Sequence, residues 1–328
     1  MTTQINGTSG ITFSDSSVQN TAAIGFRNRI INGGMTVDQR NAGASVTPTS
    51  GAFTVDRWQF SLSQASKLTA AQSSTAPAGF NKSLLITSSS AYTVGATEVF
   101  GLLQPIEGLN MPDVGFGAVG ASTLTLSFWV RSSLTGTFGG VLTNYANDRT
   151  YPFSYTISSA NTWEQKSVTI TGDTSGTWLT TNSGWGQVWF SLGVGSSKST
   201  TAGSWAAGAY YAPTGATSVV GTNGATFYIT GVQLEKGTTA SSFDFRSYGT
   251  ELALCQRYYC KSFMDGTAPS NGSSGTTFST YKGIVASPFS RPSSVPGTAN
   301  DSTTAQTSFC APIYLPVTMR TQASITIY

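Results

Sequence analysis

Short segments in which apolar and polar residues alternate dominate the middle of the chain. In TLTLSFWVR, residues 123–131, every second residue from Leu124 to Val130 is apolar, whereas Trp129 and Arg131 fall on the opposite face of an extended chain. A period of two residues is typical of a strand with one buried and one solvent-facing side. This segment is therefore predicted to be a half-buried β-strand.

Two further segments, QVWFSLGV at 187–194 and ATFYITGVQLEKG at 225–237, show the same period, and Gly231 is predicted to mark a bulge. The expected faces are Val188, Phe190, Leu192 and Val194 in the first segment, and Tyr228, Thr230, Val232 and Leu234 opposite Phe227 and Ile229 in the second. Strand signals recur about every 10 to 20 residues between loops of Gly, Ser and Thr. The predicted fold class is all-β, a jelly-roll β-sandwich of two sheets.

The segment ELALCQRYY, which begins at residue 251, departs from this pattern. Leu252, Cys255 and Tyr259 share one face at helical spacing, and Glu251 would lie at the positive end of a helix. Thr250 is predicted to be the N-cap. A short helix is expected here.

The chain is predicted to have three parts. Residues 1–26 contain too few apolar groups to form a core, so this segment is either disordered or ordered by pairing with copies of itself or with a larger structure. Residues 27–246 form the β-sandwich, and residues 247–328 form the short helix and a small C-terminal β unit. Because the final residues read as a strand that includes Ile325, Ile327 and Tyr328, this end is expected to dock against something.

Composition excludes several classes of function. Charged residues make up 9% of the chain, and 17 basic and 14 acidic residues are scattered singly, so we expect no nucleic-acid partner. The chain has no histidine, the commonest general base and metal ligand, and we therefore expect a protein that is not an enzyme. The first residues lack the pattern of a signal peptide, and no apolar run is long enough for a membrane helix. A soluble protein made in the cytoplasm, without membrane insertion, is expected.

The three cysteines are predicted to be inert thiols. On a helix, Cys255 and Cys260 would point about 140° apart, which does not suit a mutual disulfide. A zinc site needs about four ligands, and the remaining cysteine is Cys310. We predict no cofactor and no metal, and a bridge between Cys260 and Cys310, or metal or redox chemistry, remains as an alternative.

The segment SSFDFRSYGTELALCQRYYCKS, residues 241–262, resembles a motif of fibre and virion-appendage proteins of tailed bacteriophages. Cys260 departs from that motif, in which an aromatic residue is usual. The N-terminal GITFSDSSVQNTAA is similar to the element that joins fibre shafts or virion anchors to the following domain. Further segments that resemble the family lie, in order, at residues 27–41, 55–60, 104–117, 126–140, 151–178 and 227–237.

A second resemblance concerns the ends of the sandwich. RIINGGM near its start and FYITGVQLE near its end are similar to the first and last strands of carbohydrate-binding jelly-roll modules. Such modules often bind a structural calcium through an acidic residue after the NGG turn. Met35 and Thr36 stand at that place in this chain, so the resemblance does not supply the calcium ligand.

The candidate site is a concentration of aromatic residues in a region rich in Gly, Ser and Thr. Flat aromatic faces suit the C–H faces of sugar rings, and neighbouring amides and hydroxyls suit sugar hydroxyls. The alternative is that these rings fill the core or a subunit interface, because Trp189 lies within a predicted strand. The candidate glycan-binding residues are Trp178, Trp185, Trp205, Tyr210 and Tyr211.

The resemblance implies a phage virion protein, and we expect a non-enzymatic tail fibre or fibre-like appendage that attaches to a host-surface polysaccharide. Residues 1–26 would bind other virion proteins, and the chain would be a homotrimer on the tail or capsid surface. Two alternatives remain open. One is a capsid decoration, head-fibre or cement protein with a structural role, and the other is a tailspike that degrades a glycan, with carboxylates such as Glu107, Asp113 and Asp173.

Overall fold

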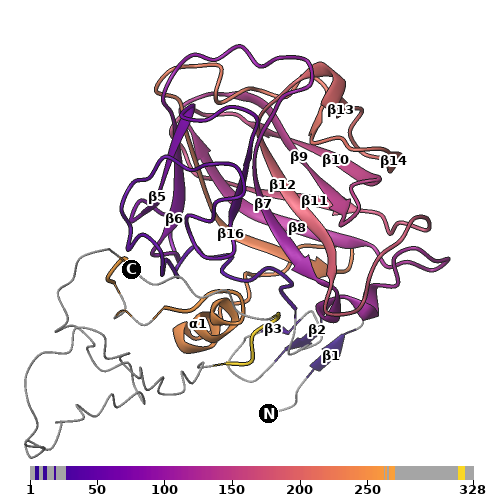
Figure 1. Ribbon diagram of the computed structural model, residues 1–328. Helices are drawn as coiled ribbons and strands as arrows, with labels where there is room; N and C mark the ends of the chain where they lie inside the picture. Colours follow the sequence, from indigo (N-terminus) through magenta and orange to yellow (C-terminus); the bar gives the residue numbers. More distant parts are fainter. Residues whose placement is uncertain are drawn as a thin grey trace, which may run out of the picture.

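The computed structural model describes residues 27–261, 263, 266–269 and 317–321, and the backbone of three short strands before residue 20. Two large antiparallel sheets pack face to face, and one α-helix of the described part, α1 (Tyr248–Gln256), follows them (Figure 1). The chain crosses repeatedly between the two sheets, and β5–β6 and β9–β10 are pairs of successive strands that stay in one sheet. The prediction of an all-β sandwich with a following short helix is confirmed.

Each sheet has a defined strand order. The six-stranded sheet runs β14 (Ala206–Ala207), β10 (Arg149–Ile157), β9 (Gly136–Asn144), β12 (Gly184–Val194), β7 (Val99–Glu107) and β4 (Gln59–Leu62). The five-stranded sheet runs β11 (Glu164–Ile170), β8 (Leu124–Ser132), β16 (Thr226–Lys236), β6 (Ser83–Ser88) and β5 (Leu68–Ser73). The first and last strands of the sandwich, β4 and β16, therefore lie in different sheets.

Smaller elements complete the described chain. A parallel pair is formed by β13 (Ser199–Thr200) and β15 (Ala212–Pro213), and a separate antiparallel sheet by β1 (Gln4–Asn6), β2 (Gly10–Thr12) and β3 (Val18–Gln19). Three short 3₁₀ turns are η1 (Gly108–Asn110), η2 (Pro112–Val114) and η3 (Ser196–Lys198). The C-terminal β unit predicted within 247–328 lies almost wholly outside the described residues. Within the described part of the chain, no helix is long and apolar enough to cross a membrane.

The core fills the space between the two sheets. Alternate residues of β8, from Leu124 to Val130, are buried in it, as the period of two predicts. On β12, Val188 and Phe190 enter the same core while Trp189 points to the opposite side of its sheet. Burial of these alternating faces is the main stabilising contribution to the fold.

The bulge predicted at Gly231 is present, and it changes which residues of β16 face the core. The pairing register between β16 and β8 shifts here, and Gly231 has a φ of +61°. Because the extra residue reverses the alternation, Val232 and Leu234 enter the same core as Phe227 and Ile229. The prediction that the two pairs lie on opposite faces is wrong, since it continued the period of two through the bulge.

Helix α1 begins earlier than predicted and packs against the first residues of the sandwich. Its N-cap is Ser247, whose hydroxyl accepts a hydrogen bond from the backbone N–H of Thr250 at 3.4 Å. The assignment of Thr250 as N-cap is therefore corrected. Cys255 is buried against Ile31 and Val37, so its place in the sequence motif reflects packing between the helix and the sandwich.

Asn28 joins the beginning of the sandwich to its last strand. Its side-chain Nδ2 donates to the carbonyl of Val232 at 3.1 Å, and its Oδ1 accepts from the backbone N–H of Leu234 at 3.2 Å. The backbone N–H of Arg29 also donates to the carbonyl of Leu234 at 2.9 Å. Buried amide groups of this kind satisfy backbone atoms that the sheet does not pair.

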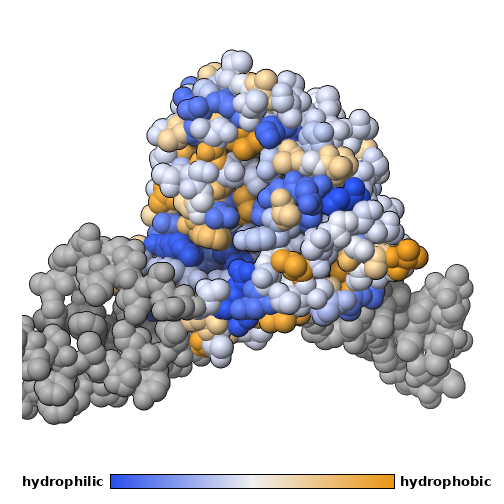
Figure 2. Space-filling model, turned by 45° about the vertical axis from the view of Figure 1, so that its right-hand side comes forward, coloured by the Kyte–Doolittle hydropathy of each residue, from blue (hydrophilic) through white to orange (hydrophobic). Residues whose placement is uncertain are grey.

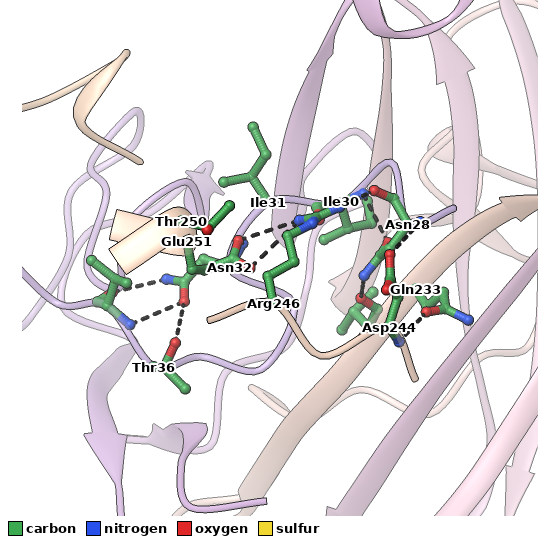
Figure 3. Close-up of polar contacts among 12 residues, drawn as sticks. Asn28, Ile30, Ile31, Asn32, Thr36, Gln233, Asp244, Arg246, Thr250 and Glu251 are labelled. Atoms are coloured by element: carbon green, nitrogen blue, oxygen red, sulfur yellow. Dashed lines mark hydrogen bonds and ion pairs between the residues drawn. The ribbon is translucent and has the colours of Figure 1, made fainter. Parts of the chain in front are cut away.

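Arg246 and Glu251 extend this network to the helix (Figure 3). The guanidinium group donates to the carbonyls of Asn28 and Ile30. It also contacts Glu251, whose carboxylate accepts a hydrogen bond from the backbone N–H of Asn32. The motif residues around 246–251 thus fix the helix to the opening segment of the sandwich, with polar groups of both segments satisfied.

A second set of contacts fixes the end of the helix to β7. The buried carboxylate of Glu107 accepts two hydrogen bonds from Arg257, at 2.6 and 3.1 Å, and one from the hydroxyl of Tyr258 at 2.5 Å. Arg57, at the start of the sandwich, lies 3.5 Å from the centroid of the Tyr258 ring. The two hydrogen bonds from Arg257 to Glu107 fix the orientation of the Arg257 guanidinium group.

The same region holds the segment 317–321. The backbone N–H of Arg320 donates to the carbonyl of Arg257 at 3.1 Å, and Arg257 donates to the carbonyl of Thr318 at 3.1 Å. Asn182 exchanges two further hydrogen bonds with Arg320. Residues far apart in the sequence are thus brought together at the end of α1.

Candidate functional site

Three of the five candidate residues come together, but inside the sandwich. Trp178 and Trp185 have ring centroids 4.4 Å apart, and Trp205 lies 5.5 Å from Trp178. Phe116 packs against all three rings. We call these four residues the tryptophan cluster.

Polar contacts hold the tryptophan cluster in place. Asp173 is buried and accepts two hydrogen bonds from Arg149, at 2.6 and 2.9 Å, and one from Nε1 of Trp178 at 3.1 Å. Nε1 of Trp205 donates to the carbonyl of Thr171 at 2.7 Å. The indole N–H groups of these two tryptophans are therefore directed at protein atoms.

Burial corrects part of the glycan-site prediction. Trp185 is 0% and Trp178 8% exposed, so neither ring has a free face on which a sugar could stack. Trp205 is half-buried and packs edge-on against Trp178. Trp178 and Trp185 are therefore core residues, which is the alternative that the sequence analysis left open.

Tyr210 and Tyr211 lie apart from this cluster. Tyr211 packs against Trp189 with ring centroids 4.5 Å apart, on the outer side of the six-stranded sheet. Burial raises the pKa of the Tyr211 hydroxyl. Tyr210 is half-buried next to Gly208. The segment that carries β13 and β15 thus covers part of this outer face.

The outer face of the five-stranded sheet carries a different set of aromatic residues. Trp163 and Tyr228 have ring centroids 6.0 Å apart, and Phe80 lies 5.1 and 5.2 Å from two further phenylalanines. All but one are half-buried, and Phe245 is 63% exposed. We call this set the aromatic row: Trp163, Tyr228, Trp129, Phe80, Phe243 and Phe245.

Gly231 explains how the middle of the aromatic row is formed. A Cβ atom at this position would lie 2.7 Å from Cζ of Phe80 and 3.1 Å from Cδ1 of Trp129. Both rings therefore lie directly over the bulge, where a side chain would displace them. The positive φ of Gly231 also favours glycine here.

Polar side chains border the aromatic row. The sheet register places Trp129 beside Gln165 on β11, whose side chain is exposed. The guanidinium carbon of Arg131 lies 5.0 Å from the centroid of the Tyr228 ring. A side-chain amide and a cation next to partly open rings are features expected of a sugar-binding surface.

The remaining surface in view is mainly polar. Figure 2 shows a face of intermediate to hydrophilic residues on which apolar residues form small separate spots. Among the described residues, four of the six large apolar side chains that are well exposed lie in the connections that follow β7 and β9 and precede β8 and β12. They are Leu109, Val119, Tyr145 and Leu179.

The carboxylates considered for glycoside hydrolysis are each bound by an arginine. Burial acts to raise the pKa of Glu107, but the hydrogen bonds from Arg257 and Tyr258 outweigh it and hold that pKa below its usual value. A general acid requires the opposite shift. The arginine contacts are Glu107 with Arg257 at 2.6 Å, Asp113 with Arg29 at 2.8 Å and Asp173 with Arg149 at 2.6 Å.

The described residues contain no group of three or more Cys, Asp or Glu side chains that could hold a metal ion. Met35, at the place of the calcium ligand in the resembling modules, is buried in the core. Burial raises the pKa of both Cys255 and Cys260, which keeps these two as protonated thiols. The alternative bridge to Cys310 concerns a residue outside the described part.

The density of aromatic residues along the sequence does not identify the aromatic row, because its members lie in separate segments of the chain. A usable signal was present, since Trp129 and Arg131 occupy the outward positions of a predicted strand. Tyr228 likewise alternates with the core residues Phe227 and Ile229. Aromatic residues at outward strand positions are a better guide to an open ring than their number per segment.

No protein-family model and no curated protein matches the chain. Similar solved structures include the enzymatically active domain of tailspike protein 4 of bacteriophage CBA120, with 12% identity and a TM-score of 0.36. This match covers 64% of the present chain and 21% of the tailspike chain.

Two other similar solved structures are of proteins named for sugar binding or solved with a sugar. A putative sugar binding protein from Bacteroides thetaiotaomicron has 14% identity and a TM-score of 0.38, and the match covers 64% of this chain and 100% of that one. TmCBM61, solved with β-1,4-galactotriose, has 10% identity and a TM-score of 0.33, with 64% and 99% covered. The assignment of a β-sandwich rests on the two sheets described above.

Proposed function

We propose that this protein is a non-enzymatic virion fibre, or fibre-like appendage, of a tailed bacteriophage that attaches the particle to a host-surface glycan. The observation that carries the binding function is the aromatic row on the outer face of the five-stranded sheet. Its rings are partly open, and amide and guanidinium groups border them. The sequence segments that resemble phage fibre proteins support the proposal that the chain is a component of the virion.

Two features favour binding over hydrolysis. The carboxylates considered as catalytic groups each contact an arginine, and the hydrogen bonds from Arg257 and Tyr258 outweigh burial and lower the pKa of Glu107. None of them belongs to the aromatic row. Binding through stacked rings and peripheral hydrogen bonds needs no titratable group, and this agrees with a chain that lacks histidine.

Locating the chain on the particle and measuring glycan turnover test this proposal together. We expect gold-labelled antibodies against the chain to mark the tail or baseplate of intact virions. Purified protein should bind the surface polysaccharide of the host and release no reducing sugar from it. Labelling of capsid facets without polysaccharide binding would point to a decoration protein, and release of reducing sugar would point to a tailspike.

We also propose that the functional unit is a homotrimer, in which residues 1–26 bind other virion proteins. Leu109, Tyr145 and Leu179 are 54, 49 and 38% exposed around one end of the sandwich. Large apolar side chains exposed around one end of a domain offer a surface that another chain can cover. A closed symmetric assembly would cover the same surface on each copy.

Light scattering of the purified full-length chain tests the trimer. We expect a mass of three times 34.2 kDa at micromolar concentration, stable over a dilution series. The variant Leu109→Asp with Leu179→Asp places charges on the exposed loops and should lower the mass to that of one chain. A single-chain mass for the unmodified protein at all concentrations would contradict an autonomous trimer.

A further inference from the structure

Arg131 differs from most other arginines of the described chain in its charge partners. Six of the nine arginines that the structure describes contact a carboxylate, as Arg149 does with Asp173. Among the described residues no acidic group contacts Arg131. Its Nε donates to the backbone carbonyl of Asn161 at 2.8 Å, which leaves the two terminal nitrogens without a described partner.

The position of Arg131 adds to this difference. The sheet register places it beside Tyr228, whose ring lies next to Trp163. The nearby Glu164 is already paired with Lys166 at 2.6 Å, so its negative charge is largely compensated. A guanidinium group therefore lies at the end of the aromatic row, held through its Nε, and its two terminal nitrogens can donate hydrogen bonds to a carboxylate.

We infer that the aromatic row binds an acidic polysaccharide, in which a uronic-acid carboxylate pairs with Arg131 while sugar rings stack on Trp163 and Tyr228. This inference rests on the proposed attachment to a glycan and adds the class of glycan. A neutral sugar would leave the guanidinium without a counter-charge. A carboxylate can receive two parallel N–H bonds from it, a geometry that an ammonium group does not offer.

The test compares polymers that differ only in charge. Polygalacturonate and alginate are offered beside their fully methyl-esterified forms, and dissociation constants are measured by calorimetry on the full-length protein. The unmodified protein should bind the acidic forms at least about tenfold more tightly, as a charge-assisted hydrogen bond predicts, and this preference should fall with added salt. Arg131→Gln should remove the preference and leave binding of the esters unchanged.

Matched variants separate this effect from general changes in charge or folding. Arg131→Lys keeps the charge but loses the fork, so we expect a reduced, still salt-dependent preference. Lys198→Gln removes one positive charge on β13's side of the sandwich and should leave binding unchanged. Trp163→Ala should weaken both polymer forms. The thermal midpoint of each variant reports its folding.

The outcomes distinguish the inference from the function beneath it. Equal binding of acidic and esterified polymers by the unmodified protein overturns the acidic preference and leaves glycan attachment standing. Binding of none of the polymers also overturns the inference, and the proposed attachment then depends on the separate measurement with the surface polysaccharide of the host. A concentration-dependent mass that Trp163→Ala abolishes would show instead that a second copy of the chain covers the row.

Discussion

Replacing Trp185 by alanine is expected to destabilise the β-sandwich by about 3 to 5 kcal/mol, the usual cost of removing a large buried aromatic side chain. The ring is fully buried and packs against Trp178 and Phe116, so its removal leaves a cavity that the two sheets can close only in part. Urea unfolding followed by circular dichroism measures the change. Loss of glycan binding with unchanged stability would contradict the buried role and restore Trp185 as a binding residue.

Trp163→Ala is the matched control, because it removes the same side chain from a half-buried place on the outer face of the sheet. We expect it to cost about 1 kcal/mol, since roughly half of the apolar surface is buried there. We therefore expect Trp185→Ala to lower mainly the stability of the fold, and Trp163→Ala to lower mainly the binding of glycan. Equal destabilisation by both would show that the aromatic row is as much a part of the core as the tryptophan cluster.

Replacing Glu107 by glutamine is expected to lower the free energy of unfolding by about 3 kcal/mol at neutral pH, as when one partner of a buried ion pair is removed. The carboxylate is 3% exposed and receives the hydrogen bonds of Arg257 and Tyr258. Urea unfolding at pH 7 measures the change. Glu164→Gln is the control, because the Glu164 side chain is more exposed than that of Glu107 and lies on an edge strand, and it should cost less than about 1 kcal/mol.

This difference should also depend on pH. The folded protein holds the pKa of Glu107 below the ordinary value of 4.5, because the bonds from Arg257 and Tyr258 outweigh the effect of burial. The contribution of the carboxylate is then complete above pH 4.5 and is lost as the pH falls through the lower, folded-state pKa. The gap in stability between the natural protein and Glu107→Gln should therefore narrow in acid. A gap that stays constant from pH 7 to well below 4.5 would contradict this role.

Much of the fold follows from the sequence because burial in a sandwich imposes a period of two. The segment from Leu124 to Val130 shows this period without interruption, and its strand was predicted correctly. The pattern fails at Gly231, where one inserted residue exchanges the two faces. Alternation in the sequence locates a strand, but the faces beyond a bulge depend on pairing with the neighbouring strand.

The candidate site was harder to predict, because exposure of a ring depends on which loop covers it. Trp189 and Trp129 both occupy outward positions of strands. The Tyr211 ring covers Trp189, whereas Trp129 remains half-buried beside Phe80. Loops of Gly, Ser and Thr carry little periodic information, so the sequence does not say which outer face they cover.

The contact between Arg257 and Arg320 has a consequence for how the chain can vary. The backbone N–H of Arg320 donates to the carbonyl of Arg257, so two residues far apart in the sequence are held together at the end of α1. The entropy lost on fixing two such points grows slowly with the number of residues between them, since each doubling adds only about 0.6 kcal/mol. Changes in the number of residues between Arg257 and Arg320 should therefore cost this contact little free energy.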